Sequence, residues 1–109
     1  LLLEFKVAAA MLRVKTVEIQ DNNIESIAVA SVLDAVKKCH LPIIVEDAGL
    51  FIEALNNFPG PYSSYVFQTI GTHGILKLMR NVDDRNACFH SVVAFCKPKG
   101  KPVTFHGSL

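Results

Sequence analysis

The stretch IIVEDAGLFIEALNNFPGPY, residues 43–62, decides how this chain is expected to fold. Its opening run of apolar β-branched residues predicts a buried strand, Ile43–Glu46, that ends in two adjacent carboxylates. The small residues Ala48-Gly49 that follow indicate a turn. Side chains alternate faces along a strand, so Glu46 and Asp47 should point to opposite sides, and only one of them can dominate a given site.

Composition indicates one folded domain. The chain has 109 residues, of which 50% are hydrophobic and 19% charged, and its net charge is +1. That balance gives no support to nucleic-acid or membrane binding by bulk electrostatics. Three cysteines without a Cys-x-x-Cys spacing, Cys39, Cys88 and Cys96, favour a reducing, cytoplasmic setting and no metal knuckle.

The rest of the chain alternates between helical and extended patterns. An extended segment at Leu50–Leu55 is expected to continue from the buried strand, and serines at 63 and 64 are expected to cap a helix. The other expected elements are a helix at 1–12, a strand at 14–19, a helix from a cap at Asn22 to before Pro42, a helix from Pro61 to about Ile70, a short helix capped by Thr72, and a hairpin of strands 87–96 and 103–106. The order predicts an α/β fold with a mixed sheet. Since the pattern looks cut at both ends, we expect a fragment of a longer domain.

Two acids on separate predicted strands are the best candidates for chemistry. Glu18 lies near the end of the first strand and Asp47 near the end of the second. If the strands are close in the sheet, the two carboxylates could share one Mg²⁺, which takes one or two protein carboxylates and keeps other positions for water and phosphate. Helix caps or salt bridges are the structural alternative for such acids. His90 and His106 are expected to face each other across the hairpin in a structural role.

The segment VEDAGLFIEALNNFPGPYSSYVFQTIG, residues 45–71, closely resembles the signature of the inosine triphosphate pyrophosphatase family, with an archaeal flavour. The segments at 74–96 and 17–20 are similar to the flanking parts of that family, so the resemblance covers nearly the whole chain. It implies an elongated two-lobed α/β fold around a cleft, typically in a homodimer. It also implies Mg²⁺-dependent hydrolysis of ITP, dITP and XTP to the monophosphate and pyrophosphate.

The resemblance also implies roles for individual residues. Asp47 matches the general base and magnesium ligand, and Glu18 matches the second acidic ligand. Glu46 matches an acidic neighbour that shapes the site, and Ala48 matches a substrate-contacting position that is usually Ser or Thr. Ala48 has no hydroxyl, so only its backbone N–H could serve a phosphate.

Several parts of the family pattern are not found in this sequence. The phosphate-gripping loop expected before Leu1 and the base-recognition segments expected after Leu109 are absent, and Leu33 replaces a phosphate-holding lysine. These departures predict weak or no activity for the chain alone. They also keep open two alternatives: a non-catalytic dimerisation or nucleotide-binding module, and a related pyrophosphatase that acts on modified pyrimidines.

Overall fold

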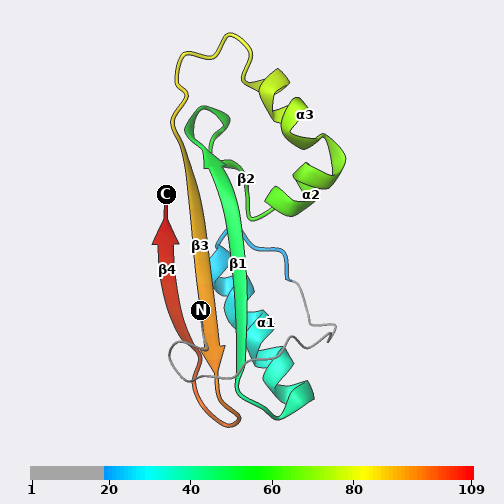
Figure 1. Cartoon of the computed structure of the whole chain (residues 1–109), viewed down its shortest axis with the longest axis vertical. Helices are drawn as coiled ribbons and strands as arrows, with labels where there is room; N and C mark the ends of the chain where they lie inside the picture. Colours follow the sequence, from blue (N-terminus) through cyan, green and yellow to red (C-terminus); the bar gives the residue numbers. More distant parts are fainter. Residues whose placement is uncertain (1–18) are drawn as a thin grey trace, which may run out of the picture.

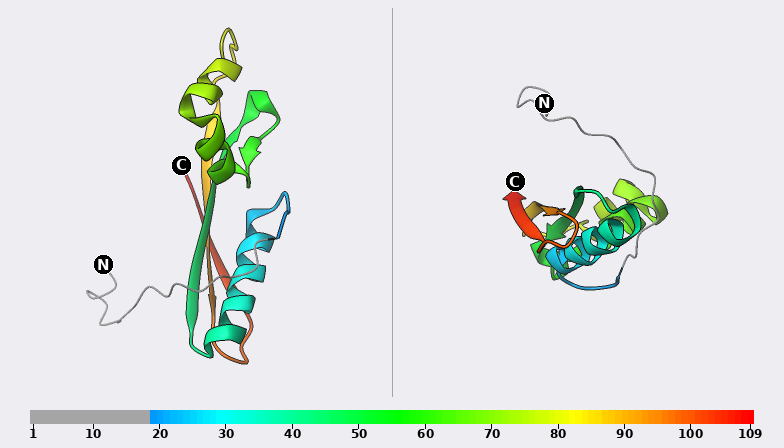
Figure 2. Two further views of the ribbon diagram at one scale, coloured as in Figure 1. Left: turned by 90° about the vertical axis from the view of Figure 1, so that its right-hand side faces the viewer. Right: turned by 90° about the horizontal axis from the view of Figure 1, so that it is seen from below.

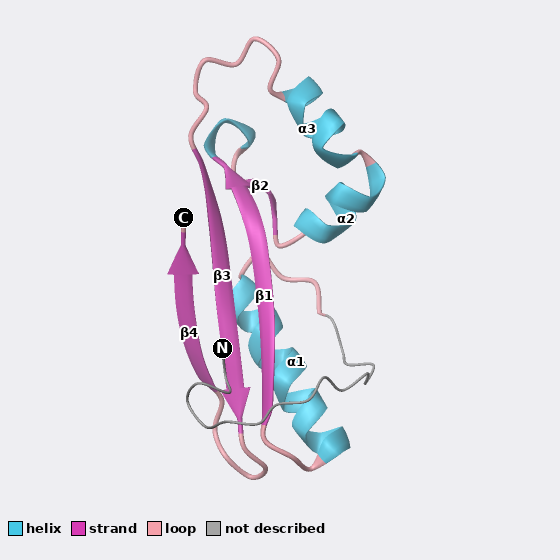
Figure 3. Ribbon diagram, viewed as in Figure 1, coloured by secondary structure: helices cyan, strands magenta, loops and turns pink. Residues whose placement is uncertain are grey.

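The computed structural model describes residues 19–109, which form three α-helices, a short 3-10 helix and four strands (Figures 1 and 3). The elements are α1 (Ile24–Cys39), β1 (Ile43–Ile52), the 3-10 helix η2 (Glu53–Leu55), β2 (Phe58–Gly60), α2 (Ser63–Thr69), α3 (Gly71–Leu78), β3 (Ala87–Cys96) and β4 (Val103–Ser108). The helix expected at 1–12 and all but the last residue of the strand expected at 14–19 lie outside the described residues.

The strands form one sheet in the order β2-β1-β3-β4, and each neighbouring pair is antiparallel. The α/β class is therefore confirmed, whereas a mixed sheet was expected and the four described strands pair only antiparallel. The predicted hairpin is confirmed as β3 and β4, which pair from Phe95 with Val103 to His90 with Ser108.

Helix α1 begins one residue later than the sequence pattern indicates. Asn23, not Asn22, is the N-cap, and its side-chain oxygen accepts a hydrogen bond from the backbone N–H of Glu25 at 2.8 Å. This bond satisfies one of the donors that a helix start leaves unpaired. The helix ends before Pro42 as predicted, with His40 in the left-handed region at φ 55°.

One face of the sheet is covered by α1, as the left view in Figure 2 shows, and the core lies between them. The core cluster consists of Ile24, Ala28, Val32 and Val36 from α1 and Val92, Ala94 and Cys96 from β3, with Ile43, Val45 and Phe51 of β1 packed against it. The apolar residues of α1 recur at helical spacing, which is why one stripe of the helix is buried. Within residues 19–109, no helix has both the length and the apolar character needed to cross a bilayer.

Strand β1 is longer than predicted, and the turn expected at Ala48-Gly49 is wrong. The strand runs unbroken through both residues to Ile52 and pairs with β3 along its whole length. Gly49 has a packing role instead, because a Cβ there would collide with the backbone carbonyl of Gly60 in β2. The extended segment expected at Leu50–Leu55 therefore ends at Ile52, where η2 begins.

The Ser63 hydroxyl, at the start of α2, connects this helix to strands β1 and β2. Ser63 Oγ accepts a hydrogen bond from the Leu50 backbone N–H at 2.8 Å and donates one to the Gly60 carbonyl at 2.6 Å. Helix α2 thus begins at Ser63 and not at Pro61, and the Ser63 hydroxyl bridges strands in place of the helix capping that was expected. Helix α3 follows from an N-cap at Ile70, so the expected Thr72 cap is also wrong.

Candidate functional site

The two adjacent acids of β1 lie on opposite faces of the sheet, as the alternation predicts. Asp47 is half-buried on the face that carries α1, where its partner across β3 is the fully buried Val92. Glu46 and Ala48 are exposed on the other face. Glu18, the proposed partner of Asp47, lies outside the described residues, so its distance from Asp47 stays a prediction.

The backbone of β1 near Asp47 has a defined orientation. Leu50 donates its N–H to Ser63 and not to β3, so the even-numbered residues of β1 direct their N–H groups away from β3. Strand β2 pairs only with residues 50–52 of β1. The N–H of Ala48 is therefore directed to the edge of β1 just beyond the end of β2, on the same strand segment as Asp47.

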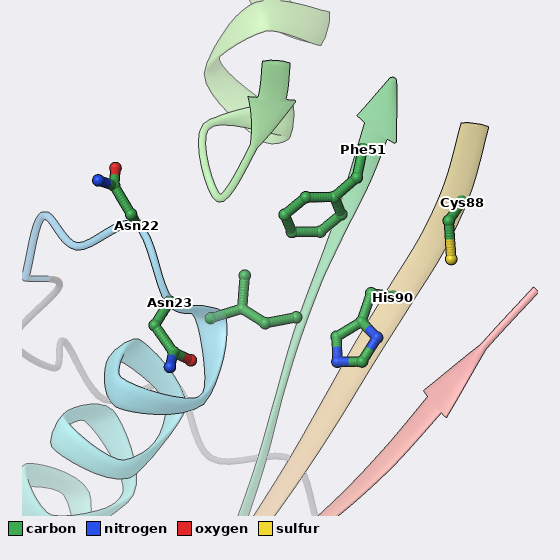
Figure 4. A pocket seen from close by; sticks show the side chains of 6 residues that line it. Asn22, Asn23, Phe51, Cys88 and His90 are labelled. Carbon is green, nitrogen blue, oxygen red and sulfur yellow. The ribbon is translucent and has the colours of Figure 1, made fainter. Parts of the chain in front are cut away.

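A hollow of about 370 Å³ lies on the helix-bearing face, between the start of α1 and the upper parts of β1 and β3. Its lining comprises Asn22, Asn23, Ile24, Phe51, Cys88 and His90, and Figure 4 shows the five labelled side chains around it. Gly49 stands between Phe51 and Asp47 on this face of β1, so the hollow begins four residues along the strand from the acid. Asp47 itself is not part of the lining.

A chain of polar contacts runs beside the hollow from β3 to α1. His90 Nε2 and His106 Nδ1 are 3.2 Å apart, and His106 Nε2 is 3.5 Å from Glu25 Oε2. The other oxygen of Glu25 accepts a hydrogen bond from Thr104 Oγ1 at 2.8 Å. The sequence predicted the facing histidines, but it gave no indication that Glu25 lies beside them. Glu25 and Thr104 are 79 positions apart in the sequence, so no local sequence pattern predicts their contact.

Asp47 can supply only part of the ligand set of a Mg²⁺ ion. Among residues 19–109, no group of three histidine, cysteine or acidic side chains is placed to hold a metal ion. One carboxylate is nevertheless enough where water and phosphate oxygens supply the remaining positions. Asp47 fits that role, and Glu46 cannot share the ion with it because the two side chains lie on opposite faces.

The helix position where a phosphate-holding lysine was expected is a surface position. Leu33 is 39% exposed on α1. Two lysines follow on the same helix, and one of them, Lys38, forms a salt bridge with Asp34 at 2.9 Å, one turn away. Lys37 is exposed near the end of α1.

A family model described as the Ham1 family matches residues 2–109. The chain belongs to the Ham1 family. This Ham1 chain is 53% identical over 92 residues to the dITP/XTP pyrophosphatase of Methanopyrus kandleri, an alignment that covers 84% of the chain and 49% of the relative. It is 40% identical over 107 residues to the dITP/XTP pyrophosphatase of Ignicoccus hospitalis, with 97% of the chain and 57% of the relative covered.

Solved structures show the same fold. The Ham1 protein of Staphylococcus aureus matches with a TM-score of 0.77 and 25% identity over 89% of this chain and 53% of that protein. A nucleoside triphosphatase, or dITP/XTP pyrophosphatase, of Mycobacterium abscessus matches with a TM-score of 0.75, 25% identity, and coverage of 90% and 55%. The Ham1 chain thus spans about half the length of the relatives it matches. The resemblance drawn from residues 45–71 is confirmed at the level of the family.

Proposed function

We propose that this chain carries the Asp47 part of the active site of a Mg²⁺-dependent pyrophosphatase that hydrolyses ITP, dITP and XTP to the monophosphate and pyrophosphate. The observation that carries the proposal is the 53% identity over 92 residues to a dITP/XTP pyrophosphatase, in a stretch that places Asp47 on the helix-bearing face of the sheet.

Asp47 is the proposed general base. Its carboxylate accepts a proton from a water molecule as the water oxygen bonds to the α-phosphorus of the substrate. The bond from that phosphorus to the bridging oxygen breaks, and pyrophosphate leaves with the bonding electrons. When bound, Mg²⁺ would offset the charge of the phosphate oxygens. The half-buried position of Asp47 supports this role, since partial exclusion of water strengthens its electrostatic interactions.

The remaining residues have supporting roles in the proposal. Glu18 is the second acidic ligand, and the N–H of Ala48 serves a phosphate oxygen from the edge of β1. Glu46 lies on the far face of the sheet from Asp47 and acts on the site only through the strand that both share. The whole protein is proposed to be a cytoplasmic homodimer. The 109-residue chain alone is expected to be weak or inactive, because each missing electrostatic contact to a phosphoryl transition state costs roughly a hundredfold or more.

Pyrophosphate release by the whole protein tests the function and the residue assignment together. With Mg²⁺ and ITP, dITP or XTP, we expect turnover that far exceeds turnover of ATP or GTP. Asp47→Asn should reduce turnover by roughly a hundredfold or more through loss of the base and ligand. Glu46→Gln, the matched neutralisation of the neighbouring acid, should reduce it far less. Equal losses in the two variants would refute the separate roles of the acids.

One alternative stays open because of two sequence features. Leu33 and Ala48 both lack the polar group that the family pattern has, which favours a non-catalytic dimerisation or nucleotide-binding module. Under that alternative, the whole protein binds ITP in a calorimeter and releases no pyrophosphate. Release from modified pyrimidine triphosphates in place of purines would instead indicate the related pyrimidine enzyme.

A further inference from the structure

A pair of histidines outside the proposed active site has the arrangement of a metal-binding pair. His90 on β3 and His106 on β4 are diagonal neighbours, because His90 pairs with Ser108 and His106 with Val92. Diagonal residues on one face of a hairpin are within reach of each other when the side chains are long or aromatic. The two rings meet with their centroids 5.4 Å apart and their planes inclined by 47°.

The separation of the facing nitrogens matches two ligands of one metal ion. With Zn–N bonds of 2.0–2.1 Å, ligand angles from square to tetrahedral put two imidazole nitrogens about 2.9–3.3 Å apart. His90 Nε2 and His106 Nδ1 are 3.2 Å apart. That distance also suits a hydrogen bond between the two rings, so an ion would replace one shared proton. For both nitrogens to bind one ion, the rings must turn so that their lone pairs meet at a common point.

A carboxylate lies beside the outer nitrogen of His106. Ligating histidines usually donate their second N–H to a carboxylate, which fixes the tautomer and orients the ring. Glu25 supplies this carboxylate to His106 Nε2 at 3.5 Å, and Thr104 holds the other oxygen of Glu25. With the proton on Nε2, Nδ1 of His106 has the lone pair, on the side that faces His90. The ring of His90 is held from its other side by an edge-on contact with Phe51 at 6.2 Å between centroids.

Access and chemistry select the class of ion. The side chains of His106 and Glu25 are each 43% exposed, so water can complete the coordination. No third histidine, cysteine or acid among residues 19–109 is placed to complete the site. Two imidazoles and water suit Zn²⁺, Ni²⁺ or Cu²⁺, whereas Mg²⁺ prefers oxygen ligands. The pair is therefore distinct in chemistry from the magnesium site proposed at Asp47.

We propose that His90 and His106 form a two-histidine site for a borderline divalent transition metal, oriented by Glu25 and open to water. Binding would join β3 to β4 and, through Glu25, to the start of α1. The inference does not depend on the pyrophosphatase proposal, because none of the three residues takes part in it.

A titration of the 109-residue chain with Zn²⁺, followed by the imidazole resonances of its four histidines, tests the site without any substitution. We expect one ion per chain and shifts at His90 and His106, while His40 and His73 serve as internal controls. Shifts at the control histidines alone, or no shift at all, would overturn the proposal. Excess Mg²⁺ should leave the Zn²⁺-induced shifts unchanged.

Calorimetry on variants adds a quantitative arm. Glu25→Gln should weaken Zn²⁺ binding by roughly 10- to 100-fold, the usual effect of losing an outer carboxylate, and His106→Ala should weaken it at least as much. His73→Ala, on α3 and away from the pair, and Asp47→Asn should leave the affinity unchanged. Circular dichroism establishes that each variant is folded. Affinity that depends on Asp47 and not on His106 would place the ion at the other site and refute the pair.

Discussion

At the scale of single residues, Gly49 shows how a contact distant in sequence decides what a position must be. A Cβ at Gly49 would meet the carbonyl group of Gly60, whose own φ of 52° favours glycine. The close approach of β2 to β1 therefore requires glycine at 49 although the strand itself does not. Gly60→Val should harm folding for a different reason, since the left-handed backbone at 60 is strained for a β-branched residue.

Gly49→Ala should lower the free energy of unfolding by about 1–3 kcal/mol, the usual effect of forcing extra volume into a packed site. The added methyl must displace backbone, which cannot move as a side-chain tip can. Denaturant unfolding measured by circular dichroism gives the difference. Gly107→Ala is the matched control in β4, where nothing lies within 4 Å of the added Cβ, and it should be neutral or slightly stabilising. Equal losses in both variants would contradict the role assigned to the Gly49–Gly60 approach.

The same residues explain which parts of the site could be predicted. Alternation along a strand depends only on local geometry, so the placement of Glu46 and Asp47 on opposite faces was predictable. The turn at Ala48-Gly49 was wrong because a glycine required by a neighbouring strand looks, in sequence, like a glycine required by a turn. The contact between Glu25 and His106 could not be found, since its partners come from elements that meet only after the sheet and helix have packed.

At the scale of elements, α1 is the segment whose local sequence best predicts its structure. Its apolar stripe, its polar start and the proline beyond its end all agree, and the helix extends from Ile24 to Cys39. The predicted N-cap, Asn22, is one residue too early. Asn22 and Asn23 have the same side chain, and only the conformation of the backbone makes Asn23 the cap. Its start matters beyond the helix, since Glu25 in the first turn contacts His106 and Thr104 of β4.

Asn23→Ala should lower the free energy of unfolding by about 1 kcal/mol through loss of the bond to the Glu25 N–H. Asn22→Ala, which changes the neighbouring amide outside the cap, should cost little. Thermal and denaturant unfolding of the two variants would measure the difference. A larger loss for Asn22 would restore it as the cap and contradict the assignment made from the structure.

Strand pairs were predictable where both partners and their turn are adjacent in sequence, as in the β3–β4 hairpin. The pairing of β1 with β3 was not, because 34 residues separate Ile52 from its nearest partner, Ala87, when they are counted between the two. The short strand β2 was missed because its three residues, Phe58-Pro59-Gly60, have the composition of a turn. Such elements exist only because a longer neighbour supplies their hydrogen bonds.

At the scale of the whole molecule, the two faces of the sheet differ in what covers them. The face with α1 is packed, whereas the opposite face exposes apolar side chains. Ile44, Phe89, Val103 and Phe105 are between 49% and 60% exposed. Contiguous apolar surface of this kind is uncommon on a monomer and usually marks a contact. Since the chain spans about half the length of its relatives, we expect this face to be less accessible in the whole protein.

The isolated chain should therefore bind the dye ANS more strongly than the whole protein does at equal concentration. Replacing Phe89 and Phe105 together with serine should lower the dye fluorescence of the isolated chain, because both side chains lie on the exposed face. Tyr65→Ser on α2 removes an aromatic ring of similar exposure elsewhere and should lower it less. Equal fluorescence from the chain and the whole protein would show that this face stays uncovered in both.

The unbroken course of β1 through its two acids has a consequence for how this segment can change over time. Loss or gain of a single codon between Ile43 and Asp47 would put the acids out of phase with the sheet, turning Asp47 to the far side and its neighbours Glu46 and Ala48 toward the helix. A substitution at one of these positions alters one side chain. An insertion or deletion of one residue would move every side chain after it to the opposite face of the sheet. A change of two residues would keep the face but move Asp47 along the strand by about 6.6 Å, so the length of this segment is constrained as well as the acid itself.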